Sequence, residues 1–592
     1  MKKIIILMTF LATMFSLNAE KMNVLFIMPD DMGKGDLSFY GNPHLKTPSI
    51  DKLASESYRF ENYHTGTTCA PTRSGLMTGM YSNKVGVWHT VMGRYILDKD
   101  YEILPQVFAK NGYATGLFGK WHLGDNYPYR PFDRGFETAF WFKGGGMTQT
   151  PDFWLNSYFD NTYFLNNTPV KVEGYCTDVL FDKAIEFMAK QKSENKAFLC
   201  YLTPNAAHFP FHVADKYSDK FKDNKNVPDA CFYAMIENID ENMAKLNAFM
   251  KSSGLDKNTI IIFTTDNGSH FTETVDPKTN EVVGFAAGLR GKKAMVYEGG
   301  HNVPFFMKLP NGKSTNVDQL TGYIDIAPTL YELCEIAIPK NLDGISVKSV
   351  IDDPQKSIDR YMVVDTQRKE LMDKNAPSVV MKGSMRLVDQ KELYDLSKDP
   401  SQAKDIANDY PEVVAEFTKV YDKYWDYIAD QNDTTKPIFL KAPNEDCVLL
   451  NTHDRHISCF WDQDLQIRGG RLTFPTGYWS VYVPEDGEYS FELFRWPTDL
   501  DVNIKDNAPA IPAIEGTSVV ARPEKGAFPY ITDVELIIGD ITKTQSIAAN
   551  ENPRSISFNK IKLKKGIYQL FANFTISKKK QMGVHYIRVT TK

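Results

Sequence analysis

Two pairs of oxygen-bearing side chains follow apolar runs that are typical of buried strands. Asp30 and Asp31 end the first run, and Asp266 and Asn267 end the second. Carboxylate and amide oxygens are the ligands that a hard divalent cation such as calcium or magnesium prefers. A single acidic pair at a strand end could instead cap a helix or accept hydrogen bonds from water. Two pairs, each after a buried strand, favour a metal site.

A lone cysteine, Cys69, opens a second segment that could do chemistry. The run Cys69–Gly79 joins this thiol to a proline kink at Pro71, to Arg73 and to a helix-like continuation. The amino end of a helix that starts here would offer backbone N–H groups and a favourable dipole to an anion. Taken alone, Arg73 would be interpreted as a surface charge.

The elements that must position these side chains form an alternating series of strands and helices. Four near-continuous apolar runs are typical of strands buried on both faces of a parallel sheet: Met22–Met28, Tyr113–Phe118, Ala197–Leu202 and Thr259–Thr265. Helix-like segments such as Tyr233–Met250 lie between them. The pattern predicts an α/β domain with a mostly parallel central sheet flanked by helices. Because the carboxyl ends of such strands line the ligand crevice, the polar residues after all four runs should meet in one pocket.

The end of the chain has a different pattern of apolar and polar residues. Residues 430–437 are polar and predict a linker. From 438 to 592, apolar and polar residues alternate, so we expect an all-β, sandwich-like module. Two segments predict hairpins: Trp479–Leu493, with a turn at Asp486-Gly487, and Ile561–Leu570, with a turn at Lys565-Gly566.

Composition and the amino-terminal segment limit the class of protein. The chain has 592 residues and a net charge of −6, from 68 Lys and Arg against 74 Asp and Glu, so it lacks the basic surplus that nucleic-acid binding requires. Residues 1–19 combine a basic start, an apolar run and a small-residue end, which predicts a secretory signal removed near Ala19. The apolar run is shorter than the ~20 residues that span a bilayer. We therefore expect a periplasmic or secreted protein without stable membrane insertion.

Seven cysteines lie far apart, without the Cys-x-x-Cys spacing of a zinc or redox site. We expect those other than Cys69 to be buried small hydrophobes or occasional disulfide partners.

Several motifs, in order along the chain, resemble the type I sulfatases, the formylglycine-dependent family of the alkaline-phosphatase-like superfamily. The run Cys69–Gly79 is similar to the signature in which a cysteine followed by x-Pro-x-Arg is oxidised to formylglycine. The further similar segments are Gly112–His122, Asn205–Pro210, Leu289–Lys293 ahead of Glu298-Gly299-Gly300, Thr321–Thr329 and Glu392–Leu396. The resemblance covers most of residues 21–430.

The resemblance also implies a division into domains. Residues 20–310 would form the catalytic α/β domain, and residues 311–429 a small antiparallel α+β subdomain. After the linker at 430–437, residues 438–592 resemble the C-terminal β-domains of secreted bacterial polysaccharide sulfatases.

Two positions depart from the family pattern, and one register stays open. Ala207 stands where proline is frequent, and Asn302 stands where arginine is common. We interpret the missing arginine as structural, so its loss weakens no catalytic assignment. Either Lys292 or Lys293 could be the last catalytic lysine, and Lys293 fits the usual spacing to Glu298 better.

The resemblance implies a nucleophile and a metal. Formylglycine at position 69, as its hydrate, would attack sulfur and form a covalent sulfated hydrate, held by Arg73 and by a calcium ion, with magnesium as the other option. The implied metal ligands are Asp30, Asp31, the modified Cys69, Asp266 and Asn267. A formylglycine-generating or sulfatase-maturating enzyme would be a required partner.

The remaining implied roles concern sulfate binding and proton transfer. Lys120, His208 and Lys293 would surround the sulfate. His208, assisted by Lys293, would protonate the leaving alcohol. Asp266 would accept the first proton of the hydrate. His122 would accept the second, which expels sulfate and restores the aldehyde.

The substrate prediction depends on accessory features. His89 and Arg94 follow the nucleophile segment closely enough to line its pocket, so they are candidate contacts to a sugar. Trp141, Lys143 and Trp154 lie in an aromatic-rich insertion that could face sugar rings or pack in the core. Together with export and the added β-module, these features favour a sulfated polysaccharide or oligosaccharide.

Two alternatives stay open. A phosphomonoesterase or phosphodiesterase of the same superfamily also uses oxygen-ligated metals, but would normally offer Ser or Thr as nucleophile and a second, often histidine-containing, metal site. A glycan-binding pseudoenzyme would keep the pocket without turnover and would retain an intact thiol at position 69.

Overall fold

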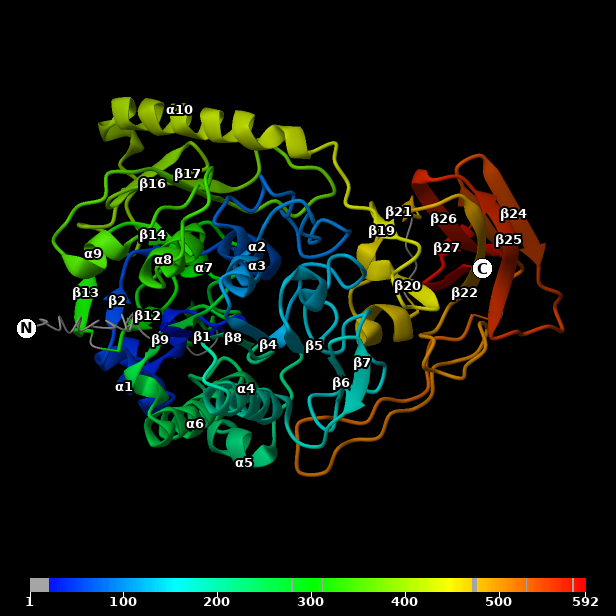
Figure 1. The fold of residues 1–592 in the computed structure, drawn as a ribbon, viewed down its shortest axis with the longest axis horizontal. Coiled ribbons are helices and arrows are strands. Elements are labelled where there is room, and N and C mark those ends of the chain that lie inside the picture. The colour runs from blue at the N-terminus through cyan, green and yellow to red at the C-terminus, as the bar shows by residue number, and fades with distance from the viewer. Residues whose placement is uncertain are drawn as a thin grey trace, which may run out of the picture.

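The computed structural model describes residues 21–277, 280–310, 312–470, 476–528, 530–577 and 580–591. The predicted secretory signal, residues 1–19, lies outside the described residues. In the described part of the chain, no helix combines the length and the apolar character that crossing a membrane requires. Figure 1 shows an α/β body that carries the long helices and, on the right, a β-rich body formed by the end of the chain.

A ten-stranded sheet forms the centre of the α/β body (Figure 1). β1 pairs in parallel with β8 and β9, and β8 pairs in parallel with β4. These four strands are the four predicted apolar runs, so the mostly parallel central sheet is confirmed. In spatial order the strands are β13 (Thr315–Val317), β2 (Tyr58–Phe60), β12 (Phe305–Lys308), β9 (Thr259–Thr264), β1 (Asn23–Ile27), β8 (Phe198–Thr203), β4 (Ala114–Lys120), β5 (Thr138–Phe142), β6 (Thr162–Leu165) and β7 (Thr168–Lys171).

Successive residues of β1 are all apolar because both faces of this strand are buried. Val24 and Phe26 pack into one hydrophobic cluster, whereas Leu25 and Ile27 pack into another on the opposite face. Helices cover both faces. Those of the first cluster are α2 (Cys69–Thr78), α3 (Leu104–Lys110) and α8 (Ile326–Leu333), and those of the second are α1 (Pro48–Ser55), α4 (Cys176–Ser193) and α6 (Ala230–Ser253). The predicted helix over 233–250 lies within α6.

A smaller antiparallel sheet follows the α/β body along the chain. Its strands are β15 (Met362–Asp365), β16 (Ser378–Lys382), β17 (Met385–Val388) and β18 (Glu392–Asp395). The helix α10 (Pro411–Ile428) packs over this sheet through Phe417 and Tyr421 and lies at the top of Figure 1. Trp88 belongs to the same hydrophobic cluster, so the small sheet is anchored to the segment that follows α2.

The end of the chain folds into two packed sheets, as the prediction of an all-β module requires. One sheet contains β19 (Ile438–Phe439), β21 (Trp479–Val483), β26 (Gly566–Ser577), β23 (Asp533–Ile538), β24 (Ile541–Ser546) and β27 (Lys580–Gly583). The other contains β20 (Cys447–Asn451), β28 (Tyr586–Thr591), β22 (Gly487–Phe494) and β25 (Ser555–Leu563). Val481 of the first sheet and Leu493 of the second belong to one hydrophobic cluster.

Both predicted hairpins are wrong. β21 pairs with β26, and β22 pairs with β25 and β28, so neither turn joins two paired strands. The turns at Asp486-Gly487 and Lys565-Gly566 carry the chain from one sheet to the other. Alternation identifies a strand and its buried face. It does not distinguish a partner beside the strand from one across the sandwich.

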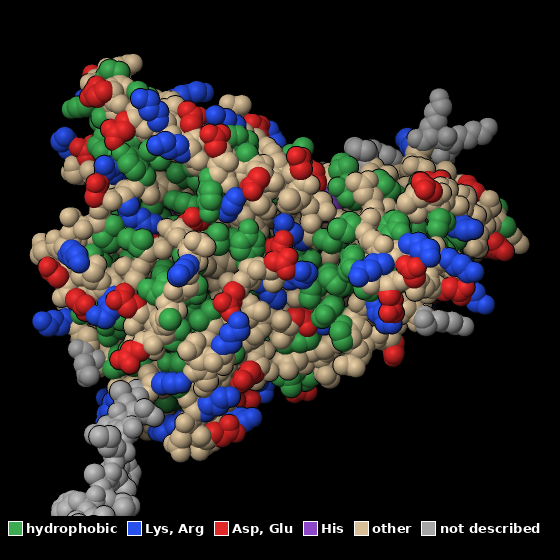
Figure 2. Space-filling view, turned by 45° about the horizontal axis from the view of Figure 1, so that its top comes forward, with side chains coloured by type: hydrophobic (Ala, Val, Ile, Leu, Met, Phe, Trp, Pro, Cys, Tyr) green, Lys and Arg blue, Asp and Glu red, His purple; other side chains and the backbone are tan. Residues whose placement is uncertain are grey.

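Charges of both signs mix on the surface, and the cysteines are buried only in part. Figure 2 shows Lys and Arg side chains interspersed with Asp and Glu over the visible face. All seven cysteines lie in the described part of the chain, and all are free. Of those other than Cys69, three are buried as expected, whereas Cys447 is exposed and Cys231 and Cys459 are partly exposed.

Candidate functional site

The helix α2 places Cys69 at its first position. Thr68, directly before it, has an extended backbone, and every residue of the helix is buried, with Cys69 only 2% exposed. Burial raises the pKa of the Cys69 thiol and outweighs the opposing effect of Lys120 and Lys293. The unmodified thiol is therefore protonated at neutral pH and a poor nucleophile. The helix start offers N–H groups to an anion at the same place.

Three carboxylates meet in the vicinity of Cys69. Asp30 and Asp31 follow β1, Asp266 follows β9, and one oxygen of each lies within 4.8 Å of the others. Asn267 joins them by donating Nδ2 to Asp31 Oδ1 at 3.0 Å. Among the described residues, Asp30 Oδ1 and Asn267 Oδ1 are buried and have no hydrogen-bond partner. Buried oxygens without donors, next to carboxylates, fit an oxygen-seeking cation.

Each carboxylate of this group has a cationic partner, so the charges balance. Two pairs are buried, Lys120 with Asp30 and Arg73 Nη2 with Asp266 Oδ2 at 2.7 Å. In the third, the partly exposed Lys293 places Nζ 2.6 Å from Asp31 Oδ1. Lys120 ends β4, as the predicted convergence of strand ends on one pocket requires, whereas Arg73 comes from α2.

The charged neighbours separate the pKa values of the carboxylates. Burial acts to raise the pKa of Asp31, but Lys293 and His208 outweigh it and hold that pKa below its ordinary value. Burial and the neighbouring Asp266 raise the pKa of Asp30 well above its ordinary value. A bound metal cation beside Asp30 would lower the free-energy cost of ionising this buried carboxyl group.

Contacts in the structure distinguish Lys293 from Lys292, the two candidates for the last catalytic lysine. Lys293 Nζ bonds to Asp31 Oδ2 at 2.7 Å, within the charged group. Lys292 lines the same cavity with an exposed side chain and has no ion-pair partner in the described chain. Lys293 therefore occupies the position expected of the catalytic lysine.

His122 has one free ring nitrogen. Its Nε2 lies 2.9 Å from Thr90 O, and because a carbonyl can only accept, the proton is on Nε2. Nδ1 is buried and has no partner among the described residues. Burial, followed by the charge of Lys120, lowers the pKa of His122 well below its ordinary value. The ring is therefore neutral at neutral pH and presents a lone pair.

In His208 it is Nδ1, and not Nε2, that bonds to a backbone carbonyl. Its Nδ1 bonds to Phe209 O at 2.5 Å, and its Nε2 lies 3.9 Å from Asp31 Oδ2. Burial, followed by Lys293 and Lys120, lowers the pKa of His208 to about 3, although Asp31 opposes this. Without substrate this ring is also neutral.

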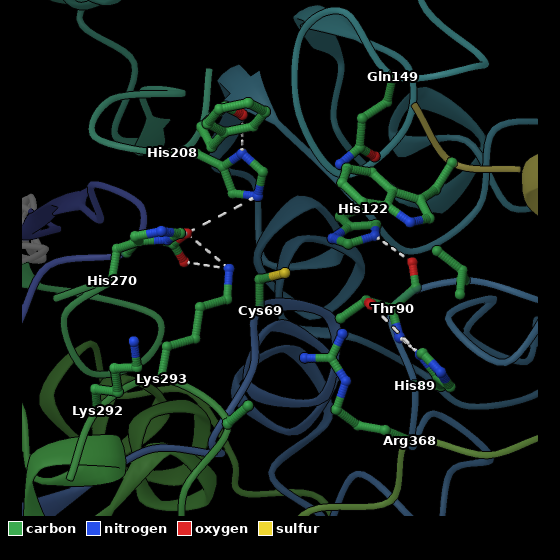
Figure 3. A pocket seen from close by; sticks show the side chains of 15 residues that line it. Cys69, His89, Thr90, His122, Gln149, His208, His270, Lys292, Lys293 and Arg368 are labelled. Carbon is green, nitrogen blue, oxygen red and sulfur yellow. Dashed lines mark hydrogen bonds and ion pairs between the residues drawn. The ribbon is translucent and has the colours of Figure 1, made fainter. Parts of the chain in front are cut away.

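A cavity of about 510 Å³ opens onto these groups. In Figure 3, Cys69 lies between Lys293 and Thr90, with His208 and His122 above it and Arg368 below. The predicted residues that line the cavity are Asp31, Cys69, His89, His122, His208 and Lys293. Asp30, Arg73, Lys120, Asp266 and Asn267 lie in the buried charged group beneath them.

The two candidate sugar contacts have different positions. His89 lines the cavity, but its Nδ1 accepts a hydrogen bond from Thr90 N–H at 2.6 Å, and the ring also bonds to the backbone of Arg368. Arg94 is not among the lining residues, because its Nη2 bonds to Glu370 Oε1 at 2.8 Å in a buried ion pair. The structure therefore does not bring Arg94 into the cavity lining, and its contact to a sugar stays a prediction.

The aromatic insertion is mainly core. Trp141 and Trp154 are buried, and the Trp154 ring packs against Trp496 at 5.7 Å between centroids. The core alternative therefore describes both tryptophans.

The aromatic side chains that line the cavity are Phe209 and, from the carboxyl-terminal module, the partly exposed Trp461. Thr150 N–H donates to Trp461 O at 3.0 Å, and Gln463 Nε2 donates to Gln149 O at 2.9 Å. Through these contacts the module forms part of the wall of the pocket.

The lining residues that sequence reasoning missed include Gln149, His270, Arg368 and Trp461. His270 carried the clearest signal, because it closely follows Asp266. The other three come from distant parts of the chain, and no spacing relates them to the motifs.

Comparisons with known proteins identify relatives over most of this chain. A family model described as sulfatase matches residues 22–336, and one described as N-sulphoglucosamine sulphohydrolase, C-terminal, matches residues 289–429. Arylsulfatase J of Mus musculus is 29% identical over 355 residues, which is 57% of this chain and 56% of that relative. The chain thus spans about half the length of that protein. N-acetylgalactosamine-6-O-sulfatase of Bacteroides thetaiotaomicron is 26% identical over 484 residues, which is 68% of this chain and 93% of that relative.

A solved structure shares the fold. The crystal structure of Ps i-CgsB in complex with k-i-k-neocarrahexaose superposes with a TM-score of 0.62 at 24% identity, and covers 70% of this chain and 95% of that chain.

Proposed function

Because this chain belongs to the sulfatase family, we propose that it hydrolyses sulfate esters of a sulfated polysaccharide or oligosaccharide. One observation carries the proposal: Cys69 opens α2 beside a balanced group of three carboxylates and three cations. Such a site combines a position for a nucleophile with positive charges where a transferring sulfate group develops negative charge.

We assign the metal to calcium, with magnesium as the alternative. Asp30, Asp31, Asp266 and Asn267 would hold it together with the modified side chain at position 69, and all their ligand atoms are oxygens. The unpartnered Oδ1 atoms of Asp30 and Asn267 support this assignment. When bound, such an ion acts as a Lewis acid on sulfate oxygens and lowers the pKa of a coordinated hydroxyl.

Cys69 would be converted to formylglycine before turnover, by a formylglycine-generating or sulfatase-maturating enzyme. The buried thiol, with its raised pKa, is unsuited to the attack. The hydrated aldehyde supplies two hydroxyl groups on one carbon, one for attack on sulfur and one through which sulfate leaves.

The charged group would bind the sulfate and accept the proton of the attacking hydroxyl. Lys120 and Lys293 would donate charge-assisted hydrogen bonds to sulfate oxygens. Burial acts to raise the pKa of Asp266, but Arg73 outweighs it, so this carboxylate stays ionised. An ionised Asp266 is suited to accept the proton of the attacking hydroxyl.

Two neutral histidines that carry their proton on different ring nitrogens would complete the proton transfers with Lys293. Lys293 and His208 lie together at Asp31 and are the proposed donors to the leaving alcohol. A negatively charged substrate beside His208 would raise its low pKa and so favour the protonated ring. His122 presents the Nδ1 lone pair that a base needs to release sulfate.

The glycan part of the proposal is supported by the relatives and by the cavity wall. A relative named N-acetylgalactosamine-6-O-sulfatase covers 68% of this chain, and a solved structure of the same fold contains a neocarrahexaose. Trp461 and Gln149 add an aromatic side chain and an amide beside the charged group, which suits a sugar ring with hydroxyl groups. Export through a signal at residues 1–19 would bring the protein to such polymers.

The phosphoesterase alternative would need a second metal site. A second candidate group in the described chain contains His64, Glu298 and His301. However, Arg386 Nε lies 2.7 Å from Glu298 Oε1, and its Nη2 lies 3.3 Å from His64 Nε2. A guanidinium thus already neutralises this group, which favours a structural role.

The proposal is tested by mass spectrometry of the peptide that contains residue 69, combined with a sulfate-release screen across algal polysaccharides and glycosaminoglycans. We expect an aldehyde at position 69 and sulfate release from at least one glycan. An intact thiol in protein from its native host would favour the pseudoenzyme. An aldehyde without release from any sulfated glycan would contradict the glycan substrate but not the reaction class.

A further inference from the structure

Arg368 presents a positive charge that no described residue neutralises. It lies between β15 and β16 and lines the cavity with an exposed side chain. In Figure 3 its guanidinium points into the cavity, below Cys69 and Thr90. The described chain includes no carboxylate that pairs with it.

The backbone that carries Arg368 is fixed on both sides. Thr366 Oγ1 lies 2.7 Å from Oγ1 of Thr67, which lies just before α2. On the other side, Trp88 Nε1 donates to Lys369 O at 3.2 Å. These contacts join the segment to the residues before and after α2. The guanidinium therefore projects from a fixed point next to the nucleophile position.

The acidic residue nearest in sequence is already engaged. Glu370 Oε1 accepts hydrogen bonds from Arg94 Nη2 and from His456 Nδ1, both at 2.8 Å. Its Oε2 accepts from Ile457 N–H at 2.8 Å. Because Glu370 is occupied by these donors, Arg368 remains without a counter-ion.

At the end of the cavity near Cys69, the negative and positive charges already balance without Arg368. Asp31, the acidic residue of the lining, pairs with Lys293. Lys292 and Arg368 line the cavity as additional cations. The lining therefore has a surplus of positive charge, although the chain as a whole carries −6. A cleft with such a surplus attracts anions beyond the one that reacts.

We propose that Arg368 binds a second anionic group of the substrate, a sulfate or a carboxylate on the reacting sugar or its neighbour. The planar guanidinium matches the paired oxygens of either group. This inference rests on the proposed function and narrows it, since the preferred glycan then carries at least two anionic groups within reach of one cavity.

The test uses full-length protein matured at position 69 and three oligosaccharides of equal length. One carries a single sulfate, one carries two sulfates, and one carries a sulfate and a carboxylate. We compare wild type with Arg368→Gln and with Lys369→Gln. Lys369 is the matched control because it is the adjacent cation, mostly exposed and paired with Asp373 outside the cavity.

Arg368→Gln should lower kcat/KM by roughly 10- to 100-fold on a doubly anionic substrate and by less than about threefold on the singly sulfated one. Lys369→Gln should stay within about twofold on all three. The two doubly anionic substrates distinguish sulfate from carboxylate. Equal losses on all three would place Arg368 at the reacting sulfate, and no loss on any would show that it makes no contact. Either result overturns the inference.

A separate measurement distinguishes failure of the inference from failure of the proposed function. If wild type releases no sulfate from any of these compounds, the proposed function fails. Calorimetric binding of the same oligosaccharides to Cys69→Ala protein, with and without Arg368→Gln, then tests Arg368 alone. Weaker binding only of the doubly anionic compounds supports the inference, and unchanged binding overturns it.

Discussion

Gly145 controls the position of His122, and Gly145→Ala tests that control. A Cβ at Gly145 would lie 2.3 Å from Cε1 and 2.5 Å from Nε2 of the His122 ring. Ordinary carbon contacts need about 3.5 Å, so the ring must shift on the order of 1 Å. The shift would break the bond to Thr90 O that fixes the ring's tautomer. A misplacement of this size should cost about 100-fold in kcat.

The assay is steady-state hydrolysis of a sulfated substrate, with thermal unfolding to check the fold. Gly146→Ala is the matched control, because its Cβ would lie 3.0 Å from Nδ1 and 3.2 Å from Cε1 of His208, a contact that a small adjustment relieves. We expect less than about a tenfold loss for this control. His122→Ala sets the scale for complete loss of the base, about 10²- to 10⁴-fold. Full activity in Gly145→Ala, together with a large loss in His122→Ala, would refute the argument that the ring must stay where the glycine allows it.

The other predictions concern sugar binding, the metal and pH. Trp461→Ala should raise KM for an oligosaccharide roughly three- to tenfold and leave kcat on a small aryl sulfate within about twofold; equal effects on both substrates would speak against stacking. Calcium added after chelation should raise the Tm of wild type but not of Asp266→Ala, because only the former keeps all the carboxylates of the site; an equal rise in both would place the ion elsewhere. Burial and the neighbouring Asp125 raise the pKa of Asp454 to about 7 from an ordinary 3.8. The folded protein therefore binds this proton more tightly than the unfolded chain, and the resulting stability, at most about 4 kcal/mol, is complete below pH 3.8 and is lost as the pH rises through 7. Denaturation of Asp454→Asn between pH 4 and 8 should show a flatter dependence than wild type, and parallel curves would contradict the assignment.

The sequence predicted the fold correctly where a local pattern of residues is compatible with only one environment, such as burial on both faces. Apolar runs such as 22–28 and 259–265 must be buried on both faces, and the oxygen ligands at their ends therefore had to meet at one edge of a parallel sheet. The residues around Cys69 were identified through motif resemblance. The structure adds what no motif states: Lys293, and not Lys292, contacts Asp31, and His122 keeps Nδ1 free.

The sequence was uninformative where position depends on distant contacts. Arg94 lies close to Cys69 along the chain, yet its ion pair with Glu370 keeps it out of the cavity lining. Conversely, Arg368 and Trp461 reach the cavity only because the small sheet and the carboxyl-terminal module pack against the α/β body. The hairpin predictions failed for a related reason, since strand partners in a sandwich are set by packing between sheets.

These long-range contacts make the carboxyl-terminal module part of the candidate active site. Besides Trp461, the module supplies His453, whose ring packs 6.0 Å from that of His122 and 4.7 Å from that of Tyr95. It also supplies Asp454, whose side chain accepts a hydrogen bond from Tyr95. Removing residues after 437 would therefore uncover the proposed base as well as open the cavity wall. Because a base at His122 would work only where its ring is held and shielded from water, the proposed reaction and the proposed glycan contact would depend on the same interface.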